Sequence, residues 1–296
     1  MQAAALERNY QGTMVYSSVG TVSSSRVAHY SVGDQSYEHI EALDGRLQQV
    51  LRHNDTVHTL WPQSGVAIVE RRDAPSARTP LLQTVDARLL EQYELRVEGR
   101  QRVAGREAEV FVLHPRDEWR YEQRLWADVE SGLMLRAEVI GSGRTVLESS
   151  GFSAIEVNVR PQPERVLQPL RQLSRWRVLR AQQERTQLES EGWQLARPLP
   201  GFHIASAVRR PLEAAADGND GKVPERMLQV VLSDGLTHVS LFVERFDEKR
   251  HRKDVQAQIG ATATRTQRRG AWWLTAMGDV PPPTLKLLLD ALERKP

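Results

Sequence analysis

The sequence predicts a mainly β, α+β protein. We expect a large curved antiparallel sheet, or half-open barrel, with helices in its concavity, followed by a smaller antiparallel sheet domain with one helix. Residues 10–157 form one β-rich run after another, separated by short turns that contain glycine. Such short connections allow hairpins but no crossover helices, so the sheet should be antiparallel. A large antiparallel sheet must also curl and cover one face.

The strands of the large sheet follow from these runs. We expect them at residues 10–16, 26–32, 40–43, 47–51, 57–61, 66–69, 95–97, 108–113, 121–126, 133–139 and 145–157. A Ser-rich turn should precede residue 26, and Asp44-Gly45 predicts a hairpin. Apolar residues of segment 81–93 fall on one helical face, which predicts a helix there. Residues 2–8 are typical of the last turns of a helix, so we expect the natural protein to begin earlier.

A different composition follows at residues 161–191. Pro161-Gln162-Pro163 ends the sheet pattern, and apolar residues then recur at near-helical spacing: Leu167, Leu170, Leu173, Trp176 and Leu179. Arginines crowd the rest. Two interpretations remain open: a basic amphipathic helix against anionic lipid or an acidic partner, and a connector helix with a solvated face, which is favoured. The shift predicts two independently folded domains, 1–160 and 192–296, joined by a linker at 161–191.

The C-terminal part again shows strand periodicity. Strands are expected on both sides of a loop at 214–224, and Asp234-Gly235 predicts a two-residue hairpin turn. Further strands are expected at 240–246, 259–266 and 271–277. The last element should be a helix at 284–293, capped by Thr284.

Composition excludes several classes of protein. The net charge is +2, which does not argue for nucleic-acid binding, and the absence of cysteine excludes disulfides, thiol catalysis and thiolate metal sites. No apolar run is long enough to span a membrane, and no signal peptide is visible. All but five of the 40 basic residues are arginine. Arginine suits carboxylate or phosphate partners, although a GC-rich genome would explain the same bias.

Catalytic motifs are missing as well. There is no His-Glu-x-x-His and no Gly-x-Ser-x-Gly, and the glycine spacing around Lys222 does not fit a phosphate loop. His53 and His58 could share a metal, but polar strand positions are the better interpretation. We therefore expect no enzyme, no cofactor and no metal site.

Two sets of candidate binding residues remain. Alternation along the strands predicts an apolar, lipid-binding cavity on the concave side of the large sheet. Its candidate lining residues, whose inward or outward direction the sequence does not settle for every strand, are Met14, Tyr16, Tyr30, Ile40, Val50, Leu60, Ile68 and Val110. The candidate partner-binding residues of the C-terminal domain, where basic forks suit an acidic peptide and one of two adjacent tryptophans must face outward, are Arg209, Arg210, Arg268, Arg269, Trp272 and Trp273.

Several short stretches resemble a known family. Residues 125–136, Leu-Trp-Ala-Asp-Val-Glu-Ser-Gly-Leu-Met-Leu-Arg, resemble the Leu-Trp-x-Asp…Gly-Leu-x-x-Arg stretch of the lipoprotein-carrier-like half-barrel. Residues 10–16, 209–212, 233–235 and 278–282 resemble the MucB/RseB family, in order and across nearly the whole chain. The resemblance implies a lipoprotein-carrier-like domain, a small C-terminal domain, and a periplasmic regulator of the sigma-E type envelope-stress (alginate) pathway.

The resemblance further implies that the protein binds the periplasmic segment of a membrane-bound anti-sigma factor and protects that segment from site-1 cleavage by a DegS-type protease. Lipopolysaccharide or acyl lipid relieves the protection. The alternative is a lipid or lipoprotein carrier of the envelope, which would use the same half-barrel but would not need a second domain. A homodimer is also left open.

Overall fold

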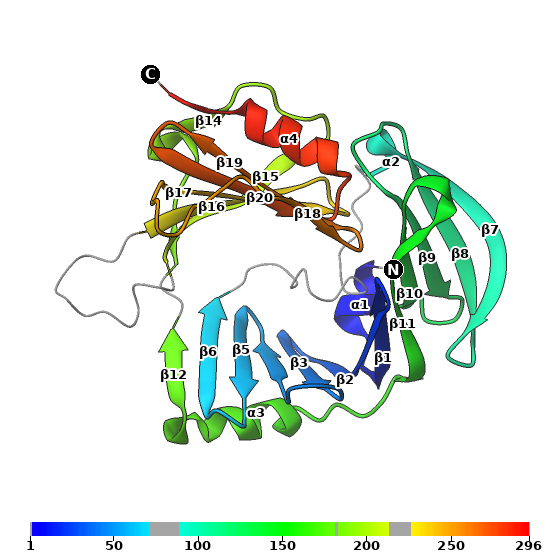
Figure 1. Cartoon of the computed structure of the whole chain (residues 1–296). Helices are drawn as coiled ribbons and strands as arrows, with labels where there is room; N and C mark the ends of the chain where they lie inside the picture. The colour runs from blue at the N-terminus through cyan, green and yellow to red at the C-terminus, as the bar shows by residue number, and fades with distance from the viewer. Residues whose placement is uncertain (1, 72–88, 181–182, 213–225, 296) are drawn as a thin grey trace. The chain divides into compact units, whose positions relative to one another are not determined.

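The fold was analysed in a computed structural model, which describes residues 2–71, 89–180, 183–212 and 226–295. The chain divides into two compact units (Figure 1). Unit 1 comprises residues 1–85, 95–113 and 122–181, and unit 2 comprises residues 86–94, 114–121 and 182–296. The helix α1 (Gln2–Glu7) confirms the helical start of the chain.

Unit 1 is built on a single large sheet. Among the described residues it has twelve strands in the order β12-β6-β5-β4-β3-β2-β1-β11-β10-β9-β8-β7, and it curves from β12 round to β7 (Figure 1). Their bounds are β1 (Tyr10–Ser18), β2 (Thr21–Val32), β3 (Gln35–Ala42), β4 (Gln49–His53), β5 (Thr56–Trp61), β6 (Val66–Arg71), β7 (Tyr93–Val103), β8 (Arg106–Pro115), β9 (Glu122–Asp128), β10 (Met134–Ile140), β11 (Val146–Val157) and β12 (Arg177–Arg180). The predicted mainly β fold class is confirmed.

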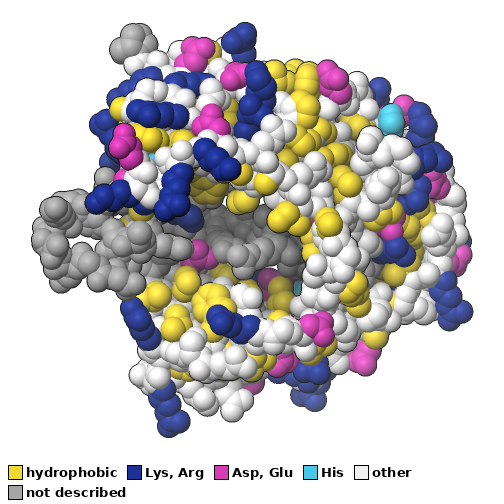
Figure 2. All heavy atoms as spheres, in the orientation of Figure 1, with side chains coloured by type: hydrophobic (Ala, Val, Ile, Leu, Met, Phe, Trp, Pro, Cys, Tyr) yellow, Lys and Arg dark blue, Asp and Glu magenta, His cyan; other side chains and the backbone are white. Residues whose placement is uncertain are grey.

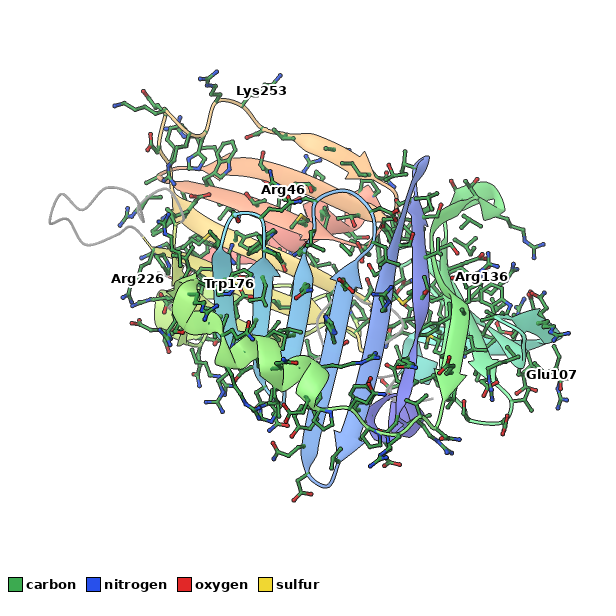
Figure 3. All side chains as sticks on the ribbon, turned by 90° about the horizontal axis from the view of Figure 1, so that it is seen from below. Arg46, Glu107, Arg136, Trp176, Arg226 and Lys253 are labelled. Carbon is green, nitrogen blue, oxygen red and sulfur yellow. The ribbon has the colours of Figure 1, made fainter. Side chains whose placement is uncertain are left out.

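A helix covers part of one face of this sheet. The helix α3 (Glu164–Arg171) crosses the strands near β3 and β4 (Figure 3). Its Val166 is fully buried in a cluster with residues from β2 to β6, and Trp176, labelled in Figure 3, packs against the same cluster. Burial of Tyr30, Leu51 and Leu60 below α3 supplies the apolar contact that holds the helix on the sheet.

The predicted helical pattern of residues 167–179 is only partly correct. The helix ends at Arg171, a 3-10 turn follows at Leu173–Arg175, and β12 then pairs in parallel with β6. The edge of β6 offers backbone groups to which residues 177–180 pair, which satisfies the edge as well as the segment. The spacing of Trp176 and Leu179 therefore does not report one helical face.

Three local predictions also differ from the structure. The serines before residue 26 lie within β2, and the chain turns earlier, at Val19-Gly20, where both residues have positive φ. Of the helix predicted at 81–93, the described part is α2 (Leu89–Gln92), since β7 begins at Tyr93; residues 81–88 lie outside the described residues. The run predicted at 259–266 is a hairpin of β18 (Gln256–Ile259) and β19 (Thr262–Arg269).

Unit 2 contains a second antiparallel sheet. Its described strands are ordered β13-β15-β16-β17-β20-β19-β18, with β14 and β21 forming a separate pair. The remaining bounds are β13 (Glu184–Arg185), β14 (Trp193–Leu195), β15 (His203–Pro211), β16 (Arg226–Ser233), β17 (His238–Arg245), β20 (Trp272–Gly278) and β21 (Leu292–Arg294). A short 3-10 turn occurs at Glu189–Glu191, and another, at Ser142–Arg144, lies in unit 1.

The C-terminal helix α4 (Pro282–Ala291) packs on β19 and β20 of this second sheet (Figure 1). Leu285, Leu288 and Leu289 are at most 1% exposed and form its core face, as the sequence predicts. The predicted Thr284 cap is wrong, because the helix begins two residues earlier. Its first turn accepts Pro282 and Pro283, since amide groups there need no intrahelical partner. No helix among the described residues has the length and apolar character needed to cross a membrane.

Unit 2 also contains two segments from the first half of the chain, residues 86–94 and 114–121. These segments are continuous with β7, β8 and β9 of the large sheet. The predicted division at 1–160, 161–191 and 192–296 stays a prediction, because compact units defined by contacts do not show which pieces fold alone.

Candidate functional site

The seven-stranded sheet has two faces with different occupants. On the first face, Leu241 pairs with Ala276 and both are fully buried in a core cluster with the leucines of α4. Because successive side chains of a strand point to opposite sides, the residues between these core positions form the other face. We call this the second face; at one end of the sheet it carries Arg210, Phe242, Glu244, Arg268 and Trp273.

The three consecutive pairs predicted as partner-binding residues split between the two faces. Arg209, Arg269 and Trp272 lie on the first face, where each has a structural contact. The guanidinium of Arg209 donates to Glu191 at 2.7 Å. That of Arg269 donates to the carbonyl oxygens of Leu289, at 2.9 Å, and Leu292, which closes the C-terminal end of α4.

Trp272 is held between two arginines. Its ring meets Trp193 edge-on at 5.5 Å, with Arg245 and Arg294 at 4.3 and 4.9 Å from its centroid. Trp193 is only 2% exposed, so this contact belongs to the core of unit 2. Arg209, Arg269 and Trp272 therefore stabilise the unit, and Arg210, Arg268 and Trp273 are the three candidates that share the second face.

Trp273 anchors an aromatic group on the second face. Its ring stacks on His251, with centroids 4.7 Å apart and planes 13° apart, and lies 6.1 Å from Phe246. The Nδ1 atom of His251 accepts the amide of Asp247 at 2.9 Å, which assigns the ring proton to Nε2. That nitrogen lies 3.3 Å from the Glu244 carboxylate, so the histidine is fixed on both sides.

Two arginines of this face lie over aromatic rings. The guanidinium carbon of Arg268 is 3.7 Å from the centroid of Phe246, and that of Arg210 is 5.6 Å from the centroid of Phe242. Stacking of this kind fixes the plane of the guanidinium. Nε of Arg268 donates to the carbonyl oxygen of Gly270 at 3.2 Å, which leaves its terminal nitrogens available. No carboxylate among the described residues pairs with either arginine, whereas Glu244 already binds Arg250 at 3.3 Å. The end of the second face is therefore locally cationic.

Figure 2 shows basic side chains on the surface of the seven-stranded unit, interspersed with acidic side chains and hydrophobic patches. Towards its other end the second face becomes less charged. Met277 is 41% exposed, and Ser240, Thr264, Thr266 and Thr275 offer hydroxyl groups from neighbouring strands. The arrangement suits an extended peptide with acidic groups at one end and small or apolar side chains at the other.

The eight candidate lipid-binding residues of the large sheet also divide between two faces. Direct cross-strand pairing places Ile40, Val50 and Ile68 on one face, in one row that continues through Thr59. Met14 and Tyr16 share that face, whereas Tyr30 and Leu60 lie on the opposite face below α3. Val110 pairs with Trp126, on the same side as Tyr30. The eight candidates therefore cannot line one surface: Met14, Tyr16, Ile40, Val50 and Ile68 share one face, and Tyr30, Leu60 and Val110 share the other.

A buried polar row lies next to these five residues. Tyr10 pairs with His29, which pairs with Glu38 on the next strand. The hydroxyl of Tyr10 and Oε1 of Glu38 are buried without a hydrogen-bond partner. Burial raises the pKa of Glu38, against the opposing charge of Arg52. The described residues contain no group of three or more metal-binding side chains.

Two models of one protein family match this chain. The MucB/RseB N-terminal domain matches residues 1–170, and the MucB/RseB C-terminal domain matches residues 187–293. The chain belongs to the MucB/RseB family. The predicted resemblance is thus confirmed, and membership of a family of regulatory proteins agrees with the expectation that the chain is not an enzyme.

Curated relatives of this family align with nearly the whole chain. The sigma factor AlgU regulatory protein MucB of Pseudomonas aeruginosa is 26% identical over 280 residues, covering 93% of this chain and 83% of the relative. The sigma-E factor regulatory protein RseB of Escherichia coli K12 is 25% identical over 293 residues, covering 99% and 88%. RseB of Haemophilus influenzae is 22% identical over 289 residues, covering 96% and 86%.

Solved MucB structures share the fold. A crystal structure of MucB in complex with MucA(peri) matches 99% of this chain and 96% of that chain, with a TM-score of 0.72 and 23% identity. The complex of Pseudomonas aeruginosa MucA and MucB matches with a TM-score of 0.74 and 23% identity, covering 100% of this chain and 96% of that chain.

Sequence reasoning missed part of the second face. Phe242 and Phe246 support the two second-face arginines, and His251 supports Trp273, but nothing in the local pattern singles them out. Alternation together with the register of β15 to β17 would have placed Phe242 on the same face as Arg210, but the sequence does not provide that register. A buried ion pair between Arg120 and Asp234 was missed as well, because its residues are 114 positions apart.

Proposed function

We propose that this chain is a periplasmic regulator that binds the periplasmic segment of a membrane-bound anti-sigma factor. Two findings support the proposal: both domains belong to the MucB/RseB family, and a MucB of the same fold has been crystallised with MucA(peri). The periplasmic location is part of the proposal, since it accompanies that partner.

The second face of the seven-stranded sheet is the proposed contact surface. The observation that carries this assignment is the pair Arg210 and Arg268, each stacked on an aromatic ring and each without a carboxylate among the described residues. Such oriented forks bind carboxylates of an acidic segment in bidentate geometry. Trp273 is only 6% exposed, so it supports the surface more than it offers contact area.

Titration of a purified anti-sigma periplasmic segment tests both statements. The wild-type chain should bind it, and Arg210→Ala/Arg268→Ala should bind about 10- to 100-fold more weakly, because two charge-assisted contacts are lost. The matched control is Arg226→Ala, which removes only an exposed pair with Glu184. Affinity should also fall as salt rises. No binding by the wild type would refute the function, and equal affinity of the double variant would refute the surface.

Protection of the bound segment from site-1 cleavage follows from the same contact. A protease of the DegS type needs its substrate as a free extended chain, and a segment lying on the sheet does not offer that chain. Cleavage of the anti-sigma segment should slow in proportion to the fraction bound to the wild type. Cleavage at the free rate with the segment fully bound would contradict shielding.

Lipid relief is proposed to act through the large sheet. Met14, Tyr16, Ile40, Val50 and Ile68 lie on one face of the sheet, and their side chains are suited to an acyl chain. A lipid changes partner affinity only if it prefers a different conformation of the chain from the one the partner prefers. The expected result is weaker binding of the anti-sigma segment in the presence of lipopolysaccharide, and loss of that effect in Ile40→Asn/Ile68→Asn.

The same experiment separates the alternative function. A lipid or lipoprotein carrier would bind a fluorescent acyl lipid on this surface without any change in affinity for the anti-sigma segment. Lipid binding together with unchanged partner affinity would therefore favour a carrier and contradict the switch.

A further inference from the structure

Arg120 is a buried cation of unit 2 that comes from the first half of the chain. It lies in segment 114–121, between β8 and β9 in the sequence, and this segment belongs to unit 2. Its Nε donates to Oδ2 of Asp234 at 2.7 Å, and the side chains of both residues are 0% exposed. A carboxylate buried in the C-terminal half is thus neutralised by a residue 114 positions earlier.

The surroundings of Arg120 match the shape of its guanidinium. One terminal nitrogen donates to Asp117 and the other to the carbonyl oxygen of Pro200, while the guanidinium carbon lies 4.7 Å from the ring of Phe202. Gly201 has a φ of +79°, and a Cβ there would lie 2.7 Å from Arg120 Nη2. Only glycine allows this close approach. Residues 200–202 therefore all contact the guanidinium of Arg120.

Asp234 connects Arg120 to the loop between β16 and β17. Its Oδ2 also accepts the hydroxyl of Tyr93 at 3.0 Å, and its Oδ1 accepts the amides of Leu236 and Thr237 at 2.9 and 2.8 Å. These bonds replace the predicted two-residue Asp234-Gly235 turn with a four-residue loop, since Ser233 pairs with His238. Burial, and secondarily the charge of Asp234, raise the pKa of Tyr93, so its hydroxyl stays a donor.

Segment 114–121 makes further contacts within unit 2. Thr284, in the first turn of α4, donates to the carbonyl oxygen of Trp119 at 3.0 Å. Gln258 of β18 donates to the hydroxyl of Tyr121 at 3.1 Å. Trp119 packs against the same core cluster that contains the leucines of α4. The segment therefore touches a helix, an edge strand and the β16–β17 loop of the C-terminal sheet.

From these contacts we infer that Arg120 is a positioning residue for the partner-binding sheet, acting through Asp234 and the β16–β17 loop. The C-terminal half is not a self-contained binding module, because residues from the middle of the first half complete it. Segment 114–121 and the β16–β17 loop are thus coupled within unit 2. Coupling of this kind acts in both directions.

Hydrogen exchange of the full chain tests the coupling without any ligand. Arg120→Met leaves the buried carboxylate of Asp234 without a cation. Exchange should therefore accelerate at residues 226–245, most of all at Leu236 and Thr237. Asp234→Asn should in turn accelerate exchange at residues 114–121. Strands β2 to β5 should be unchanged in both variants. Acceleration confined to the neighbourhood of the substituted residue, or spread over the whole chain, would overturn the inference.

Partner affinity separates positioning from simple stabilisation, and only this measurement rests on the proposed function. Arg120→Met should lower the melting temperature by roughly 10 °C. Arg120→Met/Asp234→Leu removes both charges, so its melting temperature should recover part of the loss, while the amides of Leu236 and Thr237 and the hydroxyl of Tyr93 lose their acceptor. Its loop nevertheless lacks the carboxylate that holds Leu236 and Thr237, and affinity for the anti-sigma segment should remain about tenfold reduced.

Recovery of affinity together with the melting temperature would show that Arg120 contributes stability alone, which contradicts a positioning role. The matched control is Arg226→Met, whose pair with Glu184 is exposed, with side chains 36% and 58% exposed, and which should change none of the readouts. If the wild type fails to bind the anti-sigma segment, the proposed function fails, and the exchange measurements still decide whether the coupling exists.

Discussion

Two buried carboxylates of the large sheet have opposite environments. Glu38 is 6% exposed, and its Oε1 has no hydrogen-bond partner. Asp128 is 3% exposed but receives two bonds of 2.9 Å from Arg106 and further bonds from Ser131. Burial raises the pKa of Glu38. For Asp128 the desolvation effect is outweighed by the bonds from Arg106 and Ser131, and its pKa is lowered. The two groups therefore affect stability with opposite dependence on pH.

Glu38→Gln should stabilise the chain at neutral pH. The folded pKa of Glu38 lies above its unfolded value, so ionisation opposes folding once the pH exceeds the ordinary glutamate pKa of about 4.3. We expect a gain of about 1 kcal/mol at pH 7.5 and no gain at pH 4, measured by urea unfolding at both values. A variant that is equally or less stable at pH 7.5 would contradict the assigned environment of Glu38.

Asp128→Asn should destabilise the chain at neutral pH. Because the folded pKa of Asp128 lies below its unfolded value, its contribution is present above about pH 4 and is lost as the pH falls through the folded pKa. Loss of the Arg106 pair should cost about 1–3 kcal/mol at pH 7, with a smaller difference from the wild type at pH 3. Glu130→Gln is the matched control, since Glu130 contacts the same Arg106 but is 80% exposed. A pH-independent difference would rule out this account.

Residue-level prediction from the sequence succeeded where strand alternation decides the answer. Two consecutive tryptophans had to face opposite sides, and Trp272 and Trp273 do so. Alternation does not tell which member of a pair faces the core, because that depends on the neighbouring strand. For this reason Arg209 and Arg269 were grouped with Arg210 and Arg268, although the structure gives them Glu191 and the end of α4 as partners.

At the scale of elements, α4 is the clearest test of core packing. Leu288 is 1% exposed within the core cluster, whereas the adjacent Leu287 is 37% exposed. Leu288→Ala should cost about 2–5 kcal/mol, because it leaves a cavity against the sheet, and Leu287→Ala should cost well below 1 kcal/mol. Thermal unfolding of the two variants provides the comparison. Similar losses of stability would contradict the orientation in which α4 packs on the sheet.

Elements with strong local signals were predicted well, and those set by tertiary pairing were not. The hairpins of the large sheet and the apolar stripe of α4 lie close to their predicted positions. The segment after α3 has helical spacing, yet residues 177–180 form β12, because the edge of β6 is available to pair with them. The local propensity of a segment does not predict where the edge of another strand will lie.

At the scale of the whole molecule, unit 2 draws on both halves of the chain. A protease site inserted between Gln183 and Glu184 would separate the two halves covalently. Residues 86–94 and 114–121 would remain in unit 2, so the fragments should co-elute in gel filtration and separate only in denaturant. Fragments that elute separately under native conditions would instead support the independent domains expected from the sequence.

The family resemblance and the fold class were accessible from the sequence, because the resemblance rests on several short motifs in a fixed order along the chain and the fold class on strand alternation. The ion pair of Arg120 with Asp234 was not, since no local pattern marks a contact across 114 residues. Likewise, the split of the large-sheet candidates between two faces depends on register, which a single sequence does not provide.

The most direct test of the central claim is site-specific photo-cross-linking to the anti-sigma periplasmic segment. A photoreactive amino acid is placed at Thr266 or Thr275, which pair on the second face, and, for comparison, at Leu287 on α4. If the segment lies along the second face, positions 266 and 275 will cross-link to it and position 287 will not. Cross-linking at 287, with none at 266 or 275, would contradict the proposed surface.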